Sequence, residues 1–240
     1  MPIRAVLFDW DGTIVRDAVA DPDAGPDLFA ASLAAANYAG RHMNATFTAE
    51  DFERAFHAAQ PKHIAGETTT APAMSSILAS AFAWLGVNAA SRDIDATTRI
   101  FFDSGTRGQE VYDDARMLLP SLNERGYRMA VVTNSPFTSD FVDRKAKSLG
   151  IAHYFDAVIS SADVGLAKPH PGIFQRALAA VDTDPHEALF VGDTVNTDIA
   201  GARAAGMRAI LIERSLRSHA ASGYLVIERL GALDELLGER

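Results

Sequence analysis

The sequence predicts an α/β protein in which an all-helical insert interrupts a doubly wound parallel sheet. Short apolar runs recur along the chain, segments with helical spacing separate them, and an alanine-rich stretch after the first run contains no convincing strand. Apolar runs that do not alternate are typical of strands buried on both faces, and strand–helix alternation is typical of parallel sheets. The core is therefore expected over residues 1–15 and 109–240, and the helical insert over residues 16–108.

The first predicted strand, residues 3–8, is rich in strand-forming side chains and stops abruptly at Asp9. Helical stripes follow the later strands, and glycines such as Gly150 and Gly206 mark the ends of two of these helices. The later strands are expected at residues 129–132, 157–159, 188–191 and 209–212, and the helices at residues 141–149, 173–181 and 199–203.

Helical spacing also dominates the insert. Thr48 and Asp51 are a plausible capping pair ahead of one apolar stripe. Residues 74–85 trace one face of a second helix that ends at Gly86, and Ser91 can cap a third. The insert is therefore expected to contain several helices.

Composition excludes several classes of protein. The 240 residues include 22 Lys and Arg against 31 Asp and Glu, so the net charge is −9. An acidic chain lacks the excess cations of a dedicated nucleic-acid binder. Because cysteine is absent, disulfide scaffolds, cysteine-ligated zinc sites and thiol nucleophiles are excluded. The sequence has no long uncharged run and no signal-peptide pattern, so a cytoplasmic protein without nucleic-acid or membrane partners is expected.

Polar residues directly follow the predicted strands. In an open parallel sheet, ligands bind at the carboxyl ends of the strands, so side chains at these positions are expected to meet at one edge. Each residue alone has an ordinary structural explanation, such as a hairpin turn at Asp11-Gly12 or a helix N-cap at Asp193, but their joint occurrence at consecutive strand ends favours a site. The residues concerned are Asp9, Asp11, Thr133, Asn134, Lys168, Asp193 and Asp198.

This set of side chains suits phosphoryl chemistry. Clustered carboxylates repel one another unless a cation neutralises them, and Mg²⁺ prefers carboxylate and phosphate oxygens. Thr133, Asn134 and Lys168 can donate to the remaining phosphate oxygens. A carboxylate near the metal can attack phosphorus, and a carboxyl two residues further on can protonate the leaving oxygen. For both Asp9 and Asp11 to reach a substrate, the chain must twist after Asp9, which Gly12 permits.

At four places the sequence resembles the haloacid dehalogenase superfamily, specifically its phosphatase branch with a C1-type cap. Residues 5–13 (AVLFDWDGT) look like the first motif of that family, and residues 131–134 (VVTN) look like the second. Lys168-Pro169 looks like the third, and residues 191–206, beginning VGDT, look like the fourth. The order is correct and the match runs from residue 3 to about residue 212.

The resemblance implies a Rossmann-like core and a Mg²⁺-dependent phosphatase similar to phosphoglycolate phosphatases, acting on small phosphorylated metabolites through an aspartyl-phosphate. It implies that Asp9 is the nucleophile and a Mg²⁺ ligand, and that Asp11 is the general acid/base and gives a backbone carbonyl to the metal. Asp193 would bind Mg²⁺, and Asp198 would ligate it or orient its waters. Residues expected to hold the substrate's phosphoryl group are Thr133 and Lys168, with Gly12, Thr13 and Asn134 near it.

Other activities share parts of this pattern. A phosphomutase similar to β-phosphoglucomutase would share every motif. Phosphonoacetaldehyde hydrolases resemble the chain at Trp10 and use a cap lysine, for which Lys62 is the one candidate, but Asp11 is the acid that such enzymes lack. From another class, the chain could be a non-catalytic module that binds phosphorylated ligands.

Substrate choice is expected to lie in the insert. The polar segment 61–72 separates two of its helices and carries Lys62 and His63, which we expect to contact the leaving group. An ordinary polar loop is an equal alternative. The protein is expected to be a monomer or a homodimer.

Overall fold

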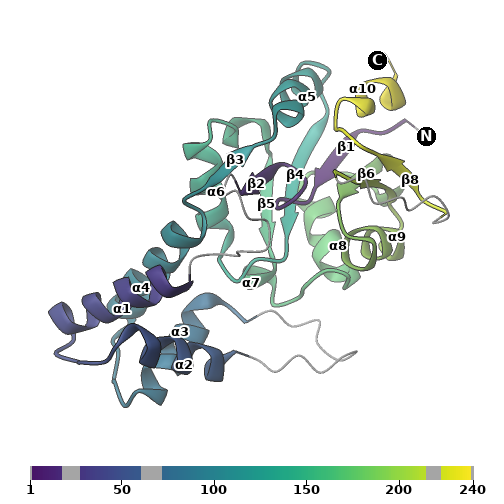
Figure 1. Ribbon diagram of the computed structural model, residues 1–240. Helices are drawn as coiled ribbons and strands as arrows, with labels where there is room; N and C mark the ends of the chain where they lie inside the picture. Colours follow the sequence, from purple (N-terminus) through teal and green to yellow (C-terminus); the bar gives the residue numbers. More distant parts are fainter. Residues whose placement is uncertain (1, 18–27, 61–71, 215–222, 239–240) are drawn as a thin grey trace. The chain divides into compact units, whose positions relative to one another are not determined.

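The computed structural model describes residues 2–17, 28–60, 72–214 and 223–238. Among these residues the chain divides into two compact units, one an α/β unit and the other helical (Figure 1). The division falls between Arg16 and Asp17 and again between Gln109 and Glu110. The sequence-based boundaries lie one residue earlier at each point.

The α/β unit is built on a six-stranded sheet in which every neighbouring pair is parallel. The strand order is β5-β4-β1-β6-β7-β8, so the N-terminal strand lies in the middle. The predicted fold class is therefore confirmed, and all five predicted strands are present. The strands are β1 (Ala5–Phe8), β4 (Arg128–Thr133), β5 (Ala157–Ser160), β6 (Ala188–Gly192), β7 (Arg208–Ile212) and β8 (Leu225–Ile227).

Both faces of this sheet are covered by helices (Figure 1). In β1, Val6 and Phe8 belong to one apolar cluster while Ala5 and Leu7 belong to the other, as the period of two in a strand requires. All four are fully buried, which explains why the strand is a continuous apolar run. The helices are α5 (Asp113–Glu124), α6 (Ser139–Ser148) and α10 (Ala232–Leu237) on the first side, α8 (Pro171–Ala180) and α9 (Ala200–Ala204) on the second, and the short α7 (Ser161–Val164) after β5.

A two-residue hairpin turn at Asp11-Gly12 does not form. β1 pairs with β4 and β6, so the chain after it is not its antiparallel partner. Residues 15–17 instead form β2 (Val15–Asp17), which pairs with β3 (Gln109–Val111). This two-stranded sheet lies where the chain passes from one unit to the other. Strands of three residues are too short to leave a periodic pattern, and the sequence did not predict them.

The helical unit packs phenylalanines at its centre. Phe52 and Phe82 are fully buried, with ring centroids 5.2 Å apart, and Phe101 lies 5.8 Å from Phe52. The capping pair predicted at Thr48 and Asp51 is confirmed. The predicted cap at Ser91 is wrong, because the N-cap position belongs to Ala90, whose amide donates to the Asp93 carboxylate. The helices of the unit are α1 (Leu28–His42), α2 (Ala49–Ala59), α3 (Met74–Trp84) and α4 (Ser91–Gly105).

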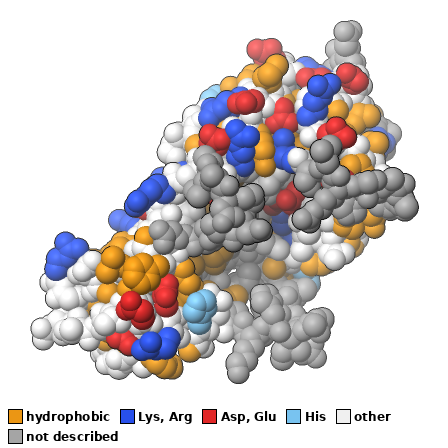
Figure 2. Space-filling model, viewed as in Figure 1, with side chains coloured by type: hydrophobic (Ala, Val, Ile, Leu, Met, Phe, Trp, Pro, Cys, Tyr) orange, Lys and Arg blue, Asp and Glu red, His pale blue; other side chains and the backbone are white. Residues whose placement is uncertain are grey.

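Charged side chains are mixed over the visible face of the α/β unit. In Figure 2, acidic and basic groups are interspersed there among apolar ones rather than gathered by sign. Within the part of the chain that the structure describes, every helix is too short or too polar to cross a membrane.

Candidate active site

Asp9 stands where the central strand ends. Its amide donates to the Val191 carbonyl (2.9 Å), so the backbone continues the alignment of β1 with β6 for one more residue. The side chain is 9% exposed. Since β4 and β6 flank β1 in parallel, Thr133 at the end of β4 and Asp193 just after β6 reach the same edge of the sheet. Thr133 is likewise buried.

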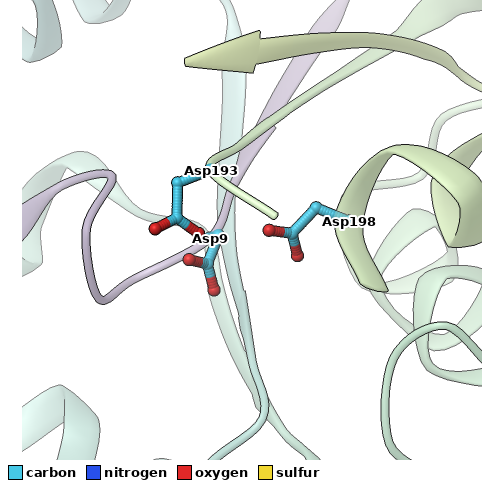
Figure 3. A group of neighbouring side chains, drawn as sticks. All are labelled: Asp9, Asp193 and Asp198. Atoms are coloured by element: carbon cyan, nitrogen blue, oxygen red, sulfur yellow. The ribbon is translucent and has the colours of Figure 1, made fainter. Parts of the chain in front are cut away.

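Three carboxylates gather at this edge. One oxygen from each of Asp9, Asp193 and Asp198 lies within 4.8 Å of the others, and the carboxyl groups converge in Figure 3. Asp198 comes from a π-helical turn, Val195–Ile199, and its Oδ2 accepts a hydrogen bond from the Thr194 amide (3.0 Å). The Asp11 side chain is exposed and is not a member of this cluster.

Gly192 makes room for the cluster. A Cβ at this position would lie 2.5 Å from Asp198 Cγ, closer than side-chain atoms can approach. The glycine of the fourth motif therefore lets the π-helical turn fold back against the end of β6. This close approach places Asp198 among the carboxylates, where it is almost fully buried.

Lys168 bridges two of the carboxylates. Its Nζ lies 2.5 Å from Asp9 Oδ1 and 2.7 Å from Asp198 Oδ1, and only 3% of its side chain is exposed. Asn134 fixes the backbone at this lysine, because its Oδ1 accepts from the Lys168 amide (2.7 Å) and its Nδ2 donates to the Lys168 carbonyl (2.9 Å). Asn134 thus links the end of β4 to Lys168, and its predicted contact with substrate stays a prediction.

Burial and charge shift the protonation of this group. Burial raises the pKa of Asp9 to about 7; the Lys168 ammonium opposes the rise and the Asp198 charge adds to it. Burial alone would lower the pKa of Lys168, but Asp9 and Asp198 outweigh it and raise that pKa above its usual value. The lysine therefore keeps its charge, while Asp9 binds a proton more readily than an exposed aspartate.

Asp193 is the member of the cluster that faces solvent. Its side chain is exposed, yet nearby protein atoms displace enough water to raise its pKa, against the effect of the Thr194 hydroxyl, which donates to Oδ1 at 3.0 Å. A pocket of about 560 Å³ opens beside it, and Gly12, Tyr112 and Arg214 contribute to the lining. The carboxylate cluster is therefore open to solvent on this side.

Gly12 has the positive φ (+73°) that the twist after Asp9 requires. Its missing side chain also matters, because a Cβ there would lie 2.2 Å from Asp193 Oδ2. The turn directs Trp10 into the apolar core and leaves Asp11 exposed. Thr13 is buried, and its Oγ1 donates to Asp9 Oδ2 over a long 3.5 Å.

The G12A variant is expected to lower kcat/KM by about a hundredfold, because the new methyl group must displace a carboxylate of the site. Gly126→Ala is the matched control: Gly126 also has a positive φ (+72°), but nothing lies within 4 Å of the added Cβ. Both substitutions strain the backbone to a similar degree. Steady-state kinetics on both variants measure the difference, and an equal loss in both would contradict a role for the close approach to Asp193.

The predicted substrate contacts at Lys62 and His63 lie outside the described residues. Arg214 was not predicted from the sequence, yet its guanidinium donates to the carbonyls of Gly12 (3.1 Å) and Thr13 (2.7 Å). Its position two residues after β7, at the carboxyl edge of the sheet, was the available signal.

Known proteins resemble this chain over most of its length. The family model described as haloacid dehalogenase-like hydrolase matches residues 3–206. A phosphoglycolate phosphatase of Pectobacterium atrosepticum is 31% identical over 217 residues, covering 87% of this chain and 79% of that protein. A phosphoserine phosphatase of Thermus thermophilus is 39% identical over 111 residues, and the chain spans only 44% of its length. The 2-haloacid dehalogenase of Pseudomonas syringae shares the fold, with a TM-score of 0.72, 24% identity and 98% of each chain covered.

Proposed function

The chain belongs to the haloacid dehalogenase-like hydrolase family, and on this premise we propose that it is a phosphatase that hydrolyses small phosphorylated metabolites. The observation that carries the proposal is the buried Asp9, held against Lys168 at the sheet edge where two further carboxylates converge. The phosphatase names of two relatives, which act on phosphoglycolate and phosphoserine as their names say, support the substrate class.

In the proposed reaction, an Asp9 oxygen attacks phosphorus and forms an aspartyl-phosphate, while Asp11 gives a proton to the departing alcohol oxygen. Asp11 then takes a proton from a water molecule, which attacks the same phosphorus, releases phosphate and restores the Asp9 carboxylate. Lys168 and Thr133 hold the phosphoryl oxygens, with Gly12, Thr13 and Asn134 near them. Buried donors fixed in this way stabilise developing charge without reorganising during the reaction.

The same residues fit a divalent cation. Asp9, Asp193 and Asp198 supply only hard oxygen donors within a small volume, which is the donor set of Mg²⁺, and the Asp11 carbonyl is the proposed backbone ligand. When bound, Mg²⁺ would neutralise charge on the phosphoryl oxygens. Lys168 supplies one positive charge to the two buried carboxylates that it bridges, and the solvent-facing Asp193 is the group best placed to admit a cation from water.

Binding of Mg²⁺ is expected to depend on pH. Below pH 7, Mg²⁺ must displace a proton from Asp9, whose pKa is about 7. The apparent Kd for Mg²⁺ should therefore be about tenfold higher at pH 6 than at pH 8. Because a ligand of the folded state raises Tm, melting curves across a MgCl₂ series at both pH values measure this. Asp198→Asn should abolish the shift in Tm. A wild-type affinity that is the same at both pH values would contradict the proposed ligands.

Release of inorganic phosphate tests the activity itself. A panel of phosphorylated metabolites, including phosphoglycolate, phosphoserine and sugar phosphates, is incubated with the protein and MgCl₂, and EDTA is expected to abolish release. Isomerisation of a sugar phosphate without phosphate release would indicate a phosphomutase instead. Binding of these compounds without any turnover would indicate a non-catalytic module.

We further propose that the helical unit is the cap of this enzyme and that it selects the substrate. Its separate compact packing supports this. Exchange of this unit with that of a relative of different specificity should transfer the substrate preference. The cytoplasmic location and the monomeric or homodimeric state stay predictions.

A further inference from the structure

We propose that Arg214 is a positioning residue that holds the turn carrying Asp11 against the carboxylate cluster. The proposal rests on the proposed function, in which Asp11 is the general acid. Arg214 Nε donates to the Gly12 carbonyl (3.1 Å), and Nη2 donates to the Thr13 carbonyl (2.7 Å). These are the two residues that directly follow Asp11, yet they lie about 200 positions away from Arg214 in the sequence.

The guanidinium itself has a fixed place. Its Nη1 donates to Asp114 Oδ2 (3.0 Å), and Cζ lies 3.5 Å from the ring centroid of Tyr112. Asp114 Oδ2 also accepts from the Leu230 amide (2.7 Å), so the carboxylate is held from two sides. The Arg214 side chain is 16% exposed. A guanidinium held by a carboxylate and an aromatic face can present its remaining N–H groups in one direction only.

The hydrogen bonds within the turn after Asp9 do not use the carbonyls of Gly12 and Thr13, so the turn depends on Arg214 as a partner for them. The amides of Ile14 and Val15 both donate to the Trp10 carbonyl, at 2.9 and 3.0 Å. The carbonyls of Gly12 and Thr13 are left for Arg214. Because Asp193 packs into the space where a side chain of Gly12 would be, a shift of this turn would move Asp11 and also open the contact with a proposed metal ligand.

Lysine cannot replace this arginine. The donors of a lysine all sit on one nitrogen at the end of a flexible side chain. They cannot bind two carbonyls and a carboxylate at the same time, as the three nitrogens of a planar guanidinium can. Arg214→Lys therefore keeps the charge but releases the turn, and Asp114→Asn weakens the same anchor more mildly. Arg125 offers a matched control remote from the site, because it donates to Asp234 and to the Gly238 carbonyl and lies over the Tyr127 ring.

The kinetic test compares two leaving groups. A misplaced general acid slows the hydrolysis of substrates whose leaving group needs a proton. It slows far less the hydrolysis of substrates whose leaving group is already stable as an anion. We expect Arg214→Lys to lower kcat/KM about a hundredfold for an alkyl phosphate but less than about tenfold for p-nitrophenyl phosphate. Asp114→Asn should lower kcat/KM in the same pattern but by smaller factors, and Arg125→Lys should leave kcat/KM unchanged for both substrates. Equal losses for both substrates would overturn the proposal.

Hydrogen–deuterium exchange of the metal-free protein tests positioning without any turnover. Amides of residues 12–15 are expected to exchange at least about tenfold faster in Arg214→Lys than in wild type or Arg125→Lys, because the turn opens locally. Unchanged exchange in folded Arg214→Lys and Asp114→Asn would overturn the proposal. A wild-type protein without phosphatase activity would instead refute the proposed function, and the exchange result would still decide the role of Arg214.

Discussion

Asp9→Asn is expected to lower kcat at least about a thousandfold, which corresponds to about 4 kcal/mol of activation free energy. An amide oxygen is a weak nucleophile and carries no charge, so attack on phosphorus is lost and the Lys168 ammonium keeps only its ion pair with Asp198. The measurement is steady-state phosphate release with MgCl₂ in excess. Asp93→Asn is the matched control, since Asp93, like Asp9, is 6% exposed as a whole residue but belongs to α4, where it accepts a hydrogen bond from the Tyr38 hydroxyl.

The two variants, Asp9→Asn and its control Asp93→Asn, are expected to differ in turnover. Asp93→Asn should retain turnover after allowance for any lost stability, because its contacts with the Ala90 amide and the Tyr38 hydroxyl lie within the helical unit. Turnover of Asp9→Asn within tenfold of wild type, with deamidation to aspartate excluded by mass spectrometry, would remove Asp9 from the role of nucleophile.

Lys168→Met is expected to damage both activity and stability. Without the ammonium, Asp9 and Asp198 face each other in a buried site, and breaking a buried ion pair typically lowers the free energy of unfolding by about 3 kcal/mol or more. Activity should also fall by about a hundredfold or more, because a fixed charge on the phosphoryl oxygens is lost. Lys147→Met is the control, since its ion pair with Asp143 is exposed and such helix pairs contribute about 0.3–0.5 kcal/mol.

The stability loss in Lys168→Met should depend on pH. Burial raises the pKa of Asp9 to about 7 and the Lys168 ammonium opposes this rise, so removing the ammonium raises the pKa further. Folded Asp9 then keeps a proton that the unfolded chain releases near pH 4. Because the folded state then binds more protons, its stability falls as pH rises. Urea unfolding of the metal-free variant should therefore show a smaller loss at pH 6 than at pH 8. A loss that is equal at both pH values, or equal to that of Lys147→Met, would contradict the bridging role.

The sheet could be predicted because strands that are buried on both faces are continuous apolar runs in the sequence. Residues 5–8 are apolar at every position, since alternate side chains meet different helix layers. α5 left a weaker signal, because Pro120 lies inside it and interrupts the helical pattern, although Asp113 and Asp114 in its first turn are typical of a helix start. β2 and β3 are too short for any periodic pattern.

The members of the site could be predicted, but their mutual contacts could not. Strand ends place Asp9, Thr133 and Asp193 at one edge, which follows from topology alone, whereas Lys168 lies in the loop between α7 and α8. That Lys168 bridges Asp9 and Asp198 depends on the π-helical turn and on the close approach at Gly192, neither of which has a sequence signature. The anchor at Arg214 is made to backbone carbonyls, and a carbonyl has no residue type by which a sequence could reveal it.

Chemical trapping tests the central claim most directly. Borohydride reduces an aspartyl-phosphate to homoserine. With p-nitrophenyl phosphate, whose leaving group needs no proton, Asp11→Asn should slow hydrolysis of the intermediate more than its formation, so that the intermediate accumulates. We predict substrate-dependent conversion of residue 9 to homoserine in this variant, detected by peptide mass spectrometry, and no conversion when Asp9 is also replaced by asparagine. Turnover of substrate with residue 9 unmodified throughout, or with the modification at another residue, would contradict the account.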